Sequence, residues 1–422
     1  MHSRILLLLV ALQTHLAALL AAYKHQLLSY YIQTNLRYIG PRIQYHPTNI
    51  PEEFYARYGP LDFKRFFRMN LSTFQHLEQA LKDAYLRNSG LNRVQRLFGW
   101  KLGIFLRFLA RAECLQSLKI TFGCCIETAR SSIFTFQRLI LFAFKNLLYT
   151  DVNDEQALQD SSNAISVLTQ GVLDGFPFII DGTHVPITKL PANIPRQCFY
   201  NRKGGRTINC QAVINASLKI VSFDCGYPGS TNDSQMLGLS SFLQLLIEIY
   251  TKYSRRFGYL ADNGYPTREY MMTPYTAAEI LRCENTEADK VQFNMIFSSV
   301  RQAVERVFGI LQKKWYLLVV GCEYDIDDYL KFIQCIVLVH NFMIDCDMTY
   351  KQSIMNDNWE LDGTPNALLD SIAQLNSLRS DEAFLEENAH SDLALGEQRR
   401  DIILMGMPNV LTQKANELES MS

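Results

Sequence analysis

The chain has almost no net charge and no unusual composition. Its 422 residues include 41 Lys and Arg against 42 Asp and Glu. A protein with this balance binds nucleic acid only through a local basic patch, because its overall field is weak. The 21 Gly and 13 Pro are ordinary counts, which excludes a fibrous or low-complexity protein. Hydrophobic residues at 48% and charged residues at 20% exclude wholesale disorder.

Cysteine patterns are missing as well. The ten cysteines include no CxxC pair and no Cys/His grouping with zinc-finger spacing. Most lie inside apolar runs, as Cys335 does in FIQCIVLVH. We therefore predict free, buried thiols in a reducing compartment rather than a disulfide framework.

Long apolar runs are scarce beyond the N-terminus. After residue 22 no stretch approaches the ~18 uninterrupted apolar residues of a membrane-spanning helix, which argues against a multispan membrane protein. The first 22 residues have a basic start, an apolar run over residues 5–12, and Ala21 and Ala22 at the end, so they resemble a signal peptide. The alternative is a packing helix, and the rest of the chain makes secretion the less favoured interpretation.

The pattern along the chain changes at three places. The apolar segment 1–22 precedes a mostly helical domain over residues 23–165, with periodic apolar positions at 71–85 and 99–118. Residues 109–123 and 126–140 form a helix-turn-helix candidate that turns at Gly123 and carries Arg130 and Arg138. DNA contact and plain helix packing both remain open for it. Residues 347–422 are expected to form a polar, peripheral C-terminal tail.

Residues 166–346 alternate strand and helix patterns. Strands are predicted at 176–181, 185–190, 208–216, 218–225 and 257–265, with 208–225 as a hairpin or two adjacent strands. Helices are predicted at about 234–250, 292–316 and 329–345. The fold class is therefore α/β, a mixed sheet flanked by helices behind a mostly helical N-terminal domain.

Three acids are placed to act together. Asp181 and Asp262 each end a predicted strand, and Glu305 lies on the helix VRQAVERVFGILQKKW. Carboxylates at strand ends face the open edge of a sheet, where ligands bind. Three carboxylates can bind two divalent cations, and such a pair activates a water for attack on a phosphodiester. This order of elements predicts a ribonuclease-H-like nuclease. Alternatively, the two Asp-containing turns are only turns, and Glu305 only pairs with Arg301.

Five ordered motifs resemble the PIF/Harbinger-type transposases and the nucleases derived from them, the DDE superfamily endonucleases. They are IIDGTHVPI, FYNRKGGRTINCQAVINASLKIVSFDCGYPGSTNDSQML, LADNGYPTREYMMTPY, FNMIFSSVRQAVERVFGILQKKW and VLVHNFM, over about residues 176–343. The resemblance implies that Asp181 and Glu305 are catalytic. The second Asp is Asp262 of ADNGY or Asp233 of PGSTNDS. We favour Asp262, because Asp233 sits in a loop entering a helix, and keep Asp233 as a possible fourth acid.

Residues outside the acids also fit such a site. His184, three positions after Asp181, is predicted to orient a phosphate or a carboxylate, with a turn histidine as the equal alternative. Residues 196–206, RQCFYNRKGGR, combine cations with aromatic residues and contain no acid. We predict DNA-backbone contacts there, although a solvated hairpin tip would look similar. The predicted contact residues are Arg196, Arg202, Lys203 and Arg206.

The resulting hypothesis is a metal-dependent DNA endonuclease or transposase acting at transposon terminal repeats. The resemblance implies two Mg²⁺ or Mn²⁺ ions, a Myb/SANT-like DNA-binding partner protein and a nuclear location with cytoplasm as a second site. We expect no organic cofactor and allow for a homo-oligomer. The alternative is a domesticated, non-catalytic DNA- or protein-binding module of the same fold.

Overall fold

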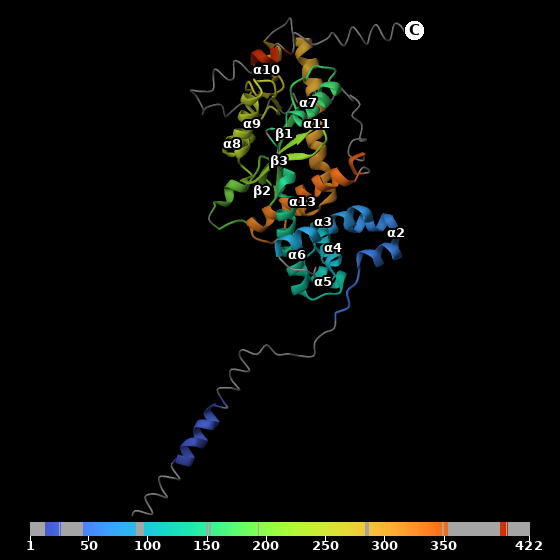
Figure 1. Ribbon diagram of the computed structural model, residues 1–422. Helices are drawn as coiled ribbons and strands as arrows, with labels where there is room; N and C mark the ends of the chain where they lie inside the picture. Colours follow the sequence, from blue (N-terminus) through green and yellow to red (C-terminus); the bar gives the residue numbers. More distant parts are fainter. Residues whose placement is uncertain are drawn as a thin grey trace, which may run out of the picture. The chain divides into compact units, whose positions relative to one another are not determined.

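The computed structural model divides the chain into two compact units, Met1–His46 and Pro47–Ser422 (Figure 1). It describes residues 13–24, 26, 45–89, 97–148, 151, 153–192, 194–282, 287–347, 350–352, 397–401 and 403. In the first unit residues 13–24 are helical, and all their side chains are exposed. The rest of the signal-like segment, residues 1–12, lies outside the described residues.

The part of the larger unit that precedes the first strand of the sheet consists of helices. They are α2 (Pro51–Phe67), α3 (Leu71–Ser89), α4 (Phe98–Arg111), α5 (Leu115–Phe122), α6 (Ile126–Phe144), the short 3₁₀ helix η1 (Lys145–Leu148) and α7 (Glu155–Leu168). The helical character predicted for this region is therefore present. The boundary predicted at residues 165/166 lies inside the larger unit, near the end of α7, and stays a prediction.

The periodic apolar positions at 99–118 fall on two helices, and the predicted helix 109–123 is interrupted, because the chain breaks between α4 and α5. Ala112 has a left-handed backbone with φ 53° and ends α4. Glu113 then accepts hydrogen bonds from Arg107 (2.7 Å) and Ser117 (2.9 Å), which ties the two helices together across the break. The helix-turn-helix candidate consequently has a first helix of only eight residues.

The predicted turn of this candidate is confirmed at Gly123. Its φ of 59° is a conformation that glycine adopts at low cost, and its N–H donates to the carbonyl of Lys119. The thiol of Cys125 then caps α6 by accepting from Thr128 N at 3.4 Å. Both Arg130 and Arg138 are exposed on α6, and their contact with DNA stays a prediction.

A five-stranded mixed sheet with the order β3-β2-β1-β4-β5 is the centre of the second half of this unit. The first three strands are antiparallel, whereas β4 and β5 run parallel to β1. The predicted hairpin is confirmed as β2 and β3. The strands are β1 (Phe178–Pro186), β2 (Thr207–Asn215), β3 (Ile220–Pro228), β4 (Tyr259–Leu260) and β5 (Met271–Met272).

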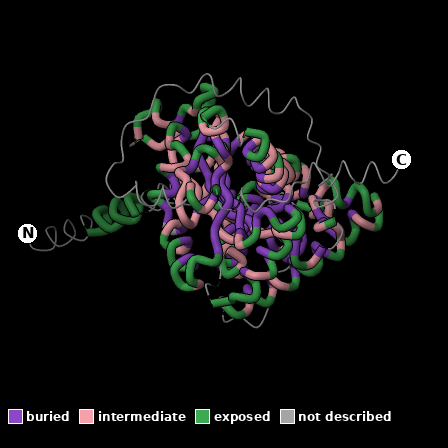
Figure 2. Tube along the Cα trace, turned by 90° about the horizontal axis from the view of Figure 1, so that it is seen from above, coloured by how far each residue is buried: buried purple, intermediate pink, exposed green. Residues whose placement is uncertain are grey.

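Helices cover both faces of this sheet (Figure 1). Phe178 and Ile180 of β1 belong to a core with Leu237 and Phe242, whereas Ile179 belongs to the core that the other face shares with α11 and α13. That second core continues into the N-terminal helices, and buried segments fill the middle of the unit in Figure 2. These helices are α8 (Asp233–Leu239), α9 (Ser241–Lys252), α10 (Ala277–Leu281), α11 (Glu287–Lys314), α12 (Leu317–Val320) and α13 (Ile326–Cys346).

The helix predicted at 234–250 is in fact two helices. Ser240 interrupts it, and its hydroxyl accepts from Phe242 N at 3.0 Å to cap α9. The predicted apolar face of α11 is confirmed, since Val304, Val307 and Leu311 are buried. Among the described residues, α13 is the helix long and apolar enough to cross a membrane, but 67% of that window is buried, as in a core helix.

The described parts of the C-terminal region are residues 347, 350–352, 397–401 and 403, and they are not simply peripheral. Asp347 and Tyr350 are buried, and the Tyr350 hydroxyl lies 2.9 Å from Nδ1 of His340 on α13.

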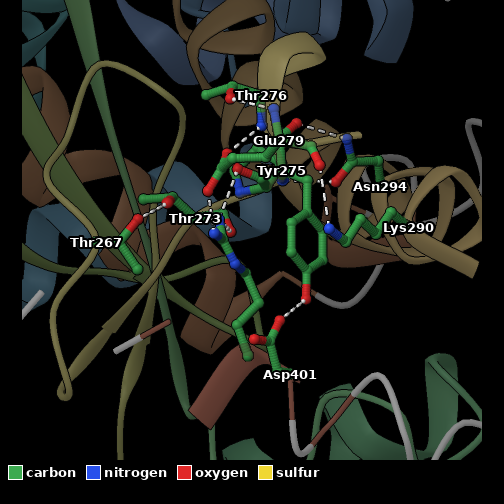
Figure 3. A network of polar contacts seen from close by, with 10 residues as sticks. Thr267, Thr273, Tyr275, Thr276, Glu279, Lys290, Asn294 and Asp401 are labelled. Atoms are coloured by element: carbon green, nitrogen blue, oxygen red, sulfur yellow. Dashed lines mark hydrogen bonds and ion pairs between the residues drawn. The ribbon is translucent and has the colours of Figure 1, made fainter. Parts of the chain in front are cut away.

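Residues 397–401 and 403 contact the rest of the unit at a second place. Arg400 is 2% exposed, pairs with Glu279 and lies 4.0 Å from the ring centroid of Tyr275. Asp401 accepts from the Tyr275 hydroxyl at 2.9 Å within the network of Figure 3. This segment therefore docks on the loop and helix that follow β5, which the polar sequence did not indicate.

The cysteines described are all free. Cys124, Cys210 and Cys335 are buried, as the apolar runs predict, whereas Cys114 is exposed. Cys283 lies outside the described residues.

Candidate active site

Asp181 lies in the middle of β1 and not at its end. The predicted strands 176–181 and 185–190 are one strand through Pro186, because β2 pairs with β1 along its whole length. On the other side of β1, the parallel pairing with β4 stops at Ile179. Asp181 therefore still borders the open edge of the parallel part of the sheet, and it is 7% exposed.

Asp262 follows the short strand β4 by two residues. Its carboxylate accepts from Gly264 N at 2.8 Å, and its carbonyl accepts from Tyr265 N at 3.2 Å, so the Asp-Asn-Gly sequence is a turn. The turn holds the carboxylate at the same edge of the sheet. The Asp-Asn-Gly motif can therefore be a turn and still present the Asp262 carboxylate to the candidate site.

Glu305 reaches Asp181 through Arg301. Arg301 and Glu305 lie on α11, which packs on β1. One guanidinium nitrogen of Arg301 is 2.6 Å from Glu305 Oε1, and the other is 3.6 Å from Asp181 Oδ2. The simple i,i+4 pair that was the alternative for Glu305 exists, and it also draws the helix carboxylate and the strand carboxylate to one cation.

Asp233 approaches from the opposite face of the sheet. Successive residues of a strand alternate between faces, so Gly182 faces α8 while Asp181 faces α11. The Asp233 carboxylate lies directly against Gly182, where a Cβ would collide with it, and Asp233 Oδ2 is 3.1 Å from the position of a Cβ on Gly264. Asn209 donates to Asp233 at 3.3 Å. Asp233 is the first residue of α8, where a carboxylate stabilises the helix dipole, while the side-chain cap is Asn232, which forms a capping box with Gln235.

The acids act on one another electrostatically. Burial, then the charge of Asp262, raises the pKa of Asp181 to about 7, and Glu305 adds to this while Arg301 opposes it. Burial and Asp262 also raise the pKa of Asp233, against the hydrogen bond from Asn209. Asp262 therefore stands between two carboxylates on opposite faces of the sheet, and all four acids belong to one cluster.

The sequence did not point to the residues that support this cluster. Gln211, paired with Gly182 across the sheet, donates to the Tyr265 hydroxyl at 2.8 Å. Burial, with the charges of Asp233, Asp181 and Asp262, raises the pKa of Tyr265, so its hydroxyl stays neutral. The polar residues Asn209 and Gln211 inside a buried strand were the available signal, because such groups need a specific partner.

His184 and the basic segment 196–206 lie beside the acids. The hydroxyl of Thr207 is 3.1 Å from His184 Nδ1. Burial, then the charges of Arg202 and Lys203, lowers the pKa of His184, and Arg202 also acts on Asp233. The segment begins with the 3₁₀ helix η2 (Arg196–Phe199) and continues as a turn closed by the Tyr200–Arg206 bridge. In this turn the Asn201 side chain accepts from the backbone N–H groups of Lys203 and Gly205. Arg196, Arg202, Lys203 and Arg206 are all exposed.

The donor chemistry of the cluster fits hard divalent cations. Asp181, Asp262 and Glu305 offer carboxylate oxygens, the ligands that such cations prefer, and burial together with the charge of Asp262 raises the pKa of Asp181. No group of three His, Cys, Asp or Glu side chains among the described residues is arranged to hold an ion as it stands. Arg301 supplies the cation between Asp181 and Glu305 in this arrangement.

One comparison with known proteins matches the part of the chain that contains these acids. The family model of the DDE superfamily endonucleases matches residues 180–341, a span that contains all four acids. Over residues 180–341 the chain is similar to the DDE superfamily endonucleases. This match confirms the resemblance to the DDE superfamily endonucleases that the sequence motifs indicate.

Relatives among characterised proteins come from plants and mammals. The chain is 22% identical over 308 residues to "Protein ALP1-like" of Arabidopsis thaliana, which covers 68% of this chain and 72% of the relative. It is 27% identical over 163 residues to "Putative nuclease HARBI1" of Bos taurus and of Homo sapiens. Those matches cover 39% of this chain and 42% of each mammalian protein. No solved structure gives a significant match.

Proposed function

We propose that this protein is a metal-dependent endonuclease that cleaves phosphodiester bonds of DNA on a ribonuclease-H-like fold. One observation carries the proposal, the convergence of Asp181, Asp262 and Glu305 from β1, from the end of β4 and from α11. The strand order supports it, because three antiparallel strands precede the parallel β4 and the helix that carries the Glu.

Asp181, Asp262 and Glu305 would hold the divalent cations. When bound, Mg²⁺ or Mn²⁺ lowers the pKa of an attacking water and stabilises the departing 3′ oxygen. Asp181 contributes a rigid carboxylate, since it lies inside a paired strand and accepts from Gly182 N at 2.8 Å. Arg301 keeps Glu305 turned toward Asp181 and lowers their mutual repulsion while no cation is bound.

Asp262 remains the proposed second acid, with Asp233 as the fourth. Asp262 influences both Asp181 and Asp233, whereas Asp233 does not figure among the charges that shift the pKa of Asp181. Because Asp233 lies on the far side of Gly182, its proposed role is to hold Asp262 and the neighbouring backbone.

The basic segment 196–206 would bind the DNA backbone beside the acids. Arg202 and Lys203 are exposed and close enough to shift the pKa of His184, which itself borders the cluster. A phosphate held there offsets the repulsion between an acidic site and a polyanion. His184 has a depressed pKa, so the neutral imidazole would orient a phosphate or a bound water through a hydrogen bond.

Wider aspects of the function follow from the resemblance alone. We propose terminal repeats of a transposon as substrate, a Myb/SANT-like partner protein for sequence-specific binding, self-association, and a nuclear location. The alternative function is a non-catalytic DNA- or protein-binding module. It is favoured by one observation, that Arg301 holds the acids without a preformed metal-ligand group among the described residues.

Nicking of supercoiled plasmid by the purified full-length chain tests the proposal. We expect relaxation with Mg²⁺ or Mn²⁺ and none in EDTA. Asp181→Asn and Glu305→Gln should each lower the rate by at least about 100-fold while DNA binding in EDTA is retained. The matched control Asp160→Asn changes an exposed acid of α7 and should keep full activity. Metal-independent binding with no cleavage at any metal concentration would instead support the non-catalytic module.

A further inference from the structure

A cavity of about 420 Å³ lies in the helical part of the larger unit, and no acid of the candidate active site lines it. Its lining comes from α2, from the residue that ends α2, and from α4. The volume falls within the range of about 300–1,000 Å³ that is usual for small-ligand sites.

Arginines dominate the lining of this cavity. They are Arg65, Arg68, Arg107 and Arg111. Two of them have carboxylate partners, since Arg65 lies 3.5 Å from Asp62 and Arg107 lies 2.7 Å from Glu113. Within the described residues, no carboxylate pairs with Arg68 or Arg111. The cavity therefore holds more positive charge than its own acids neutralise.

Arg68 is the residue least satisfied by the protein. Its Nε is buried and has no hydrogen-bond partner in the described part of the chain. Burial, then the positive charges of Arg111 and Arg107, lowers the pKa of its guanidinium. The guanidinium groups of Arg68, Arg107 and Arg111 line the same cavity and repel one another, so a bound anion between Arg68 and Arg111 would be favourable.

Aromatic rings form the other wall. Phe54 lies 4.7 Å from Tyr58 and 4.6 Å from Phe66, centroid to centroid, and the Arg107 guanidinium lies 4.3 Å from the centre of the Phe66 ring. Tyr58 is 47% exposed, so a face of the aromatic wall is open to a ligand. Arginine beside open aromatic faces is the composition with which proteins bind single-stranded nucleic acid, by phosphate contact and base stacking.

We propose that this cavity binds one nucleotide of single-stranded DNA, with the phosphate against Arg68 and Arg111 and the base against Tyr58. An acidic or phosphorylated peptide would use the arginines but would leave the aromatic wall without a role. The choice of DNA rests on the proposed function, for which the cavity is a second contact remote in sequence from residues 196–206. The binding itself needs no metal and no cleavage.

The test is binding of a 20-residue oligothymidine to the full-length chain in EDTA, followed by fluorescence anisotropy. Arg68→Gln with Arg111→Gln should weaken binding at least 10-fold. It should also reduce the slope of log affinity against log salt by about 1.4, at about 0.7 for each lost contact to a single strand. The control, Arg87→Gln with Arg282→Gln, removes two exposed charges elsewhere. It should leave both the affinity and the salt slope within twofold of the wild-type values.

Two further measurements make the outcome decisive. Tyr58→Ala should weaken binding of oligothymidine about 10-fold but leave an abasic strand of equal length unaffected. If circular dichroism shows that the double variant is misfolded, Arg111→Glu alone, at an exposed position, should give the same loss. An unchanged salt slope overturns the proposal. So does a phosphopeptide that needs Arg68 and Arg111 while DNA binding is unaffected, because that result assigns the cavity to a protein partner.

Because the assay contains EDTA, failure of the proposed nuclease activity does not affect it. A protein that never cleaves DNA can still bind oligothymidine through this cavity. Conversely, normal nuclease activity combined with oligothymidine binding that does not depend on Arg68, Arg111 and Tyr58 would refute the proposed role of the cavity. The proposed active site would be unaffected by that result.

Discussion

Replacing Asp181 by Asn should stabilise the metal-free protein above neutral pH. Burial and the neighbouring Asp262 raise the pKa of Asp181 from 3.8 to about 7. For an acid whose folded-state pKa is raised, the stabilising contribution is complete below the unfolded pKa and is lost as the pH rises through the folded pKa. The gap of about three units corresponds to about 4 kcal/mol of unfolding free energy at 1.36 kcal/mol per unit.

Most of this loss falls in an accessible pH window. Between pH 5 and pH 8 the wild-type protein should lose about 2.5 kcal/mol through Asp181, because the folded carboxyl ionises only above neutrality. Asp181→Asn cannot ionise, and its amide oxygen can still accept from Gly182 N. The free energy of unfolding of the variant relative to wild type should therefore rise by about 2.5 kcal/mol over the same window.

Urea unfolding in EDTA at pH 5 and pH 8 measures this difference. Asp160→Asn is the matched control, because it removes an exposed acid and should leave the pH dependence as in wild type. Adding Mg²⁺ at pH 8 should stabilise wild type and not Asp181→Asn, since a cation removes the repulsion that the variant lacks. An equal difference between wild type and Asp181→Asn at both pH values would refute the electrostatic account of the cluster.

Three further outcomes are expected. Asp262→Asn should abolish Mg²⁺-dependent nicking of a plasmid, whereas Asp233→Asn should lower the rate by about 10-fold and leave metal binding measurable by calorimetry; the reverse result would make Asp233 the second essential acid. Arg301→Gln should tighten Mg²⁺ binding several-fold in the same calorimetric titration, because a competing cation is removed; weaker binding would show that Arg301 instead organises the ligands. Arg400→Met should lower the free energy of unfolding by about 2 kcal/mol in urea titrations, since the ion pair with Glu279 is lost, and an unchanged midpoint would mean that the C-terminal segment does not dock.

Much of the fold could be predicted from local pattern. Strong periodicity placed α11, α13 and the β2–β3 hairpin, because burial on one face requires apolar residues at fixed spacing. The polar sequence Asp-Gly-Thr-His reads as a turn between two strands, yet β1 continues through it. Its backbone groups find partners on β2, a pairing that depends on residues about 25 positions away. Local propensity could not show this, since the stabilising hydrogen bonds come from tertiary structure.

The site was predictable as a set of acids but not as a set of contacts. Ordered motifs proposed Asp181 and Glu305 and left Asp262 and Asp233 as candidates for the second acid, whereas the position of Asp233 on the opposite face follows from the pleat of β1 and the absence of a Cβ at Gly182. The bridge from Arg301 to Asp181 spans 120 positions in the sequence and depends on how α11 crosses the sheet. The docking of Arg400 was missed for the same reason, because a polar segment gives no apolar periodicity to detect.

The arrangement of charge is the physical basis on which we propose that a chain with almost no net charge acts on DNA. Four carboxylates gather at one edge of the sheet, and a polyanion would avoid them unless cations stood close by. Arg301 lies inside the cluster, and Arg202 and Lys203 lie at its rim, where they already shift the pKa of His184. In the proposed function these cations would meet the phosphate, and divalent cations would neutralise the negative charge that the acids retain. On this view metal binding and DNA binding are coupled, because each removes part of the repulsion that opposes the other.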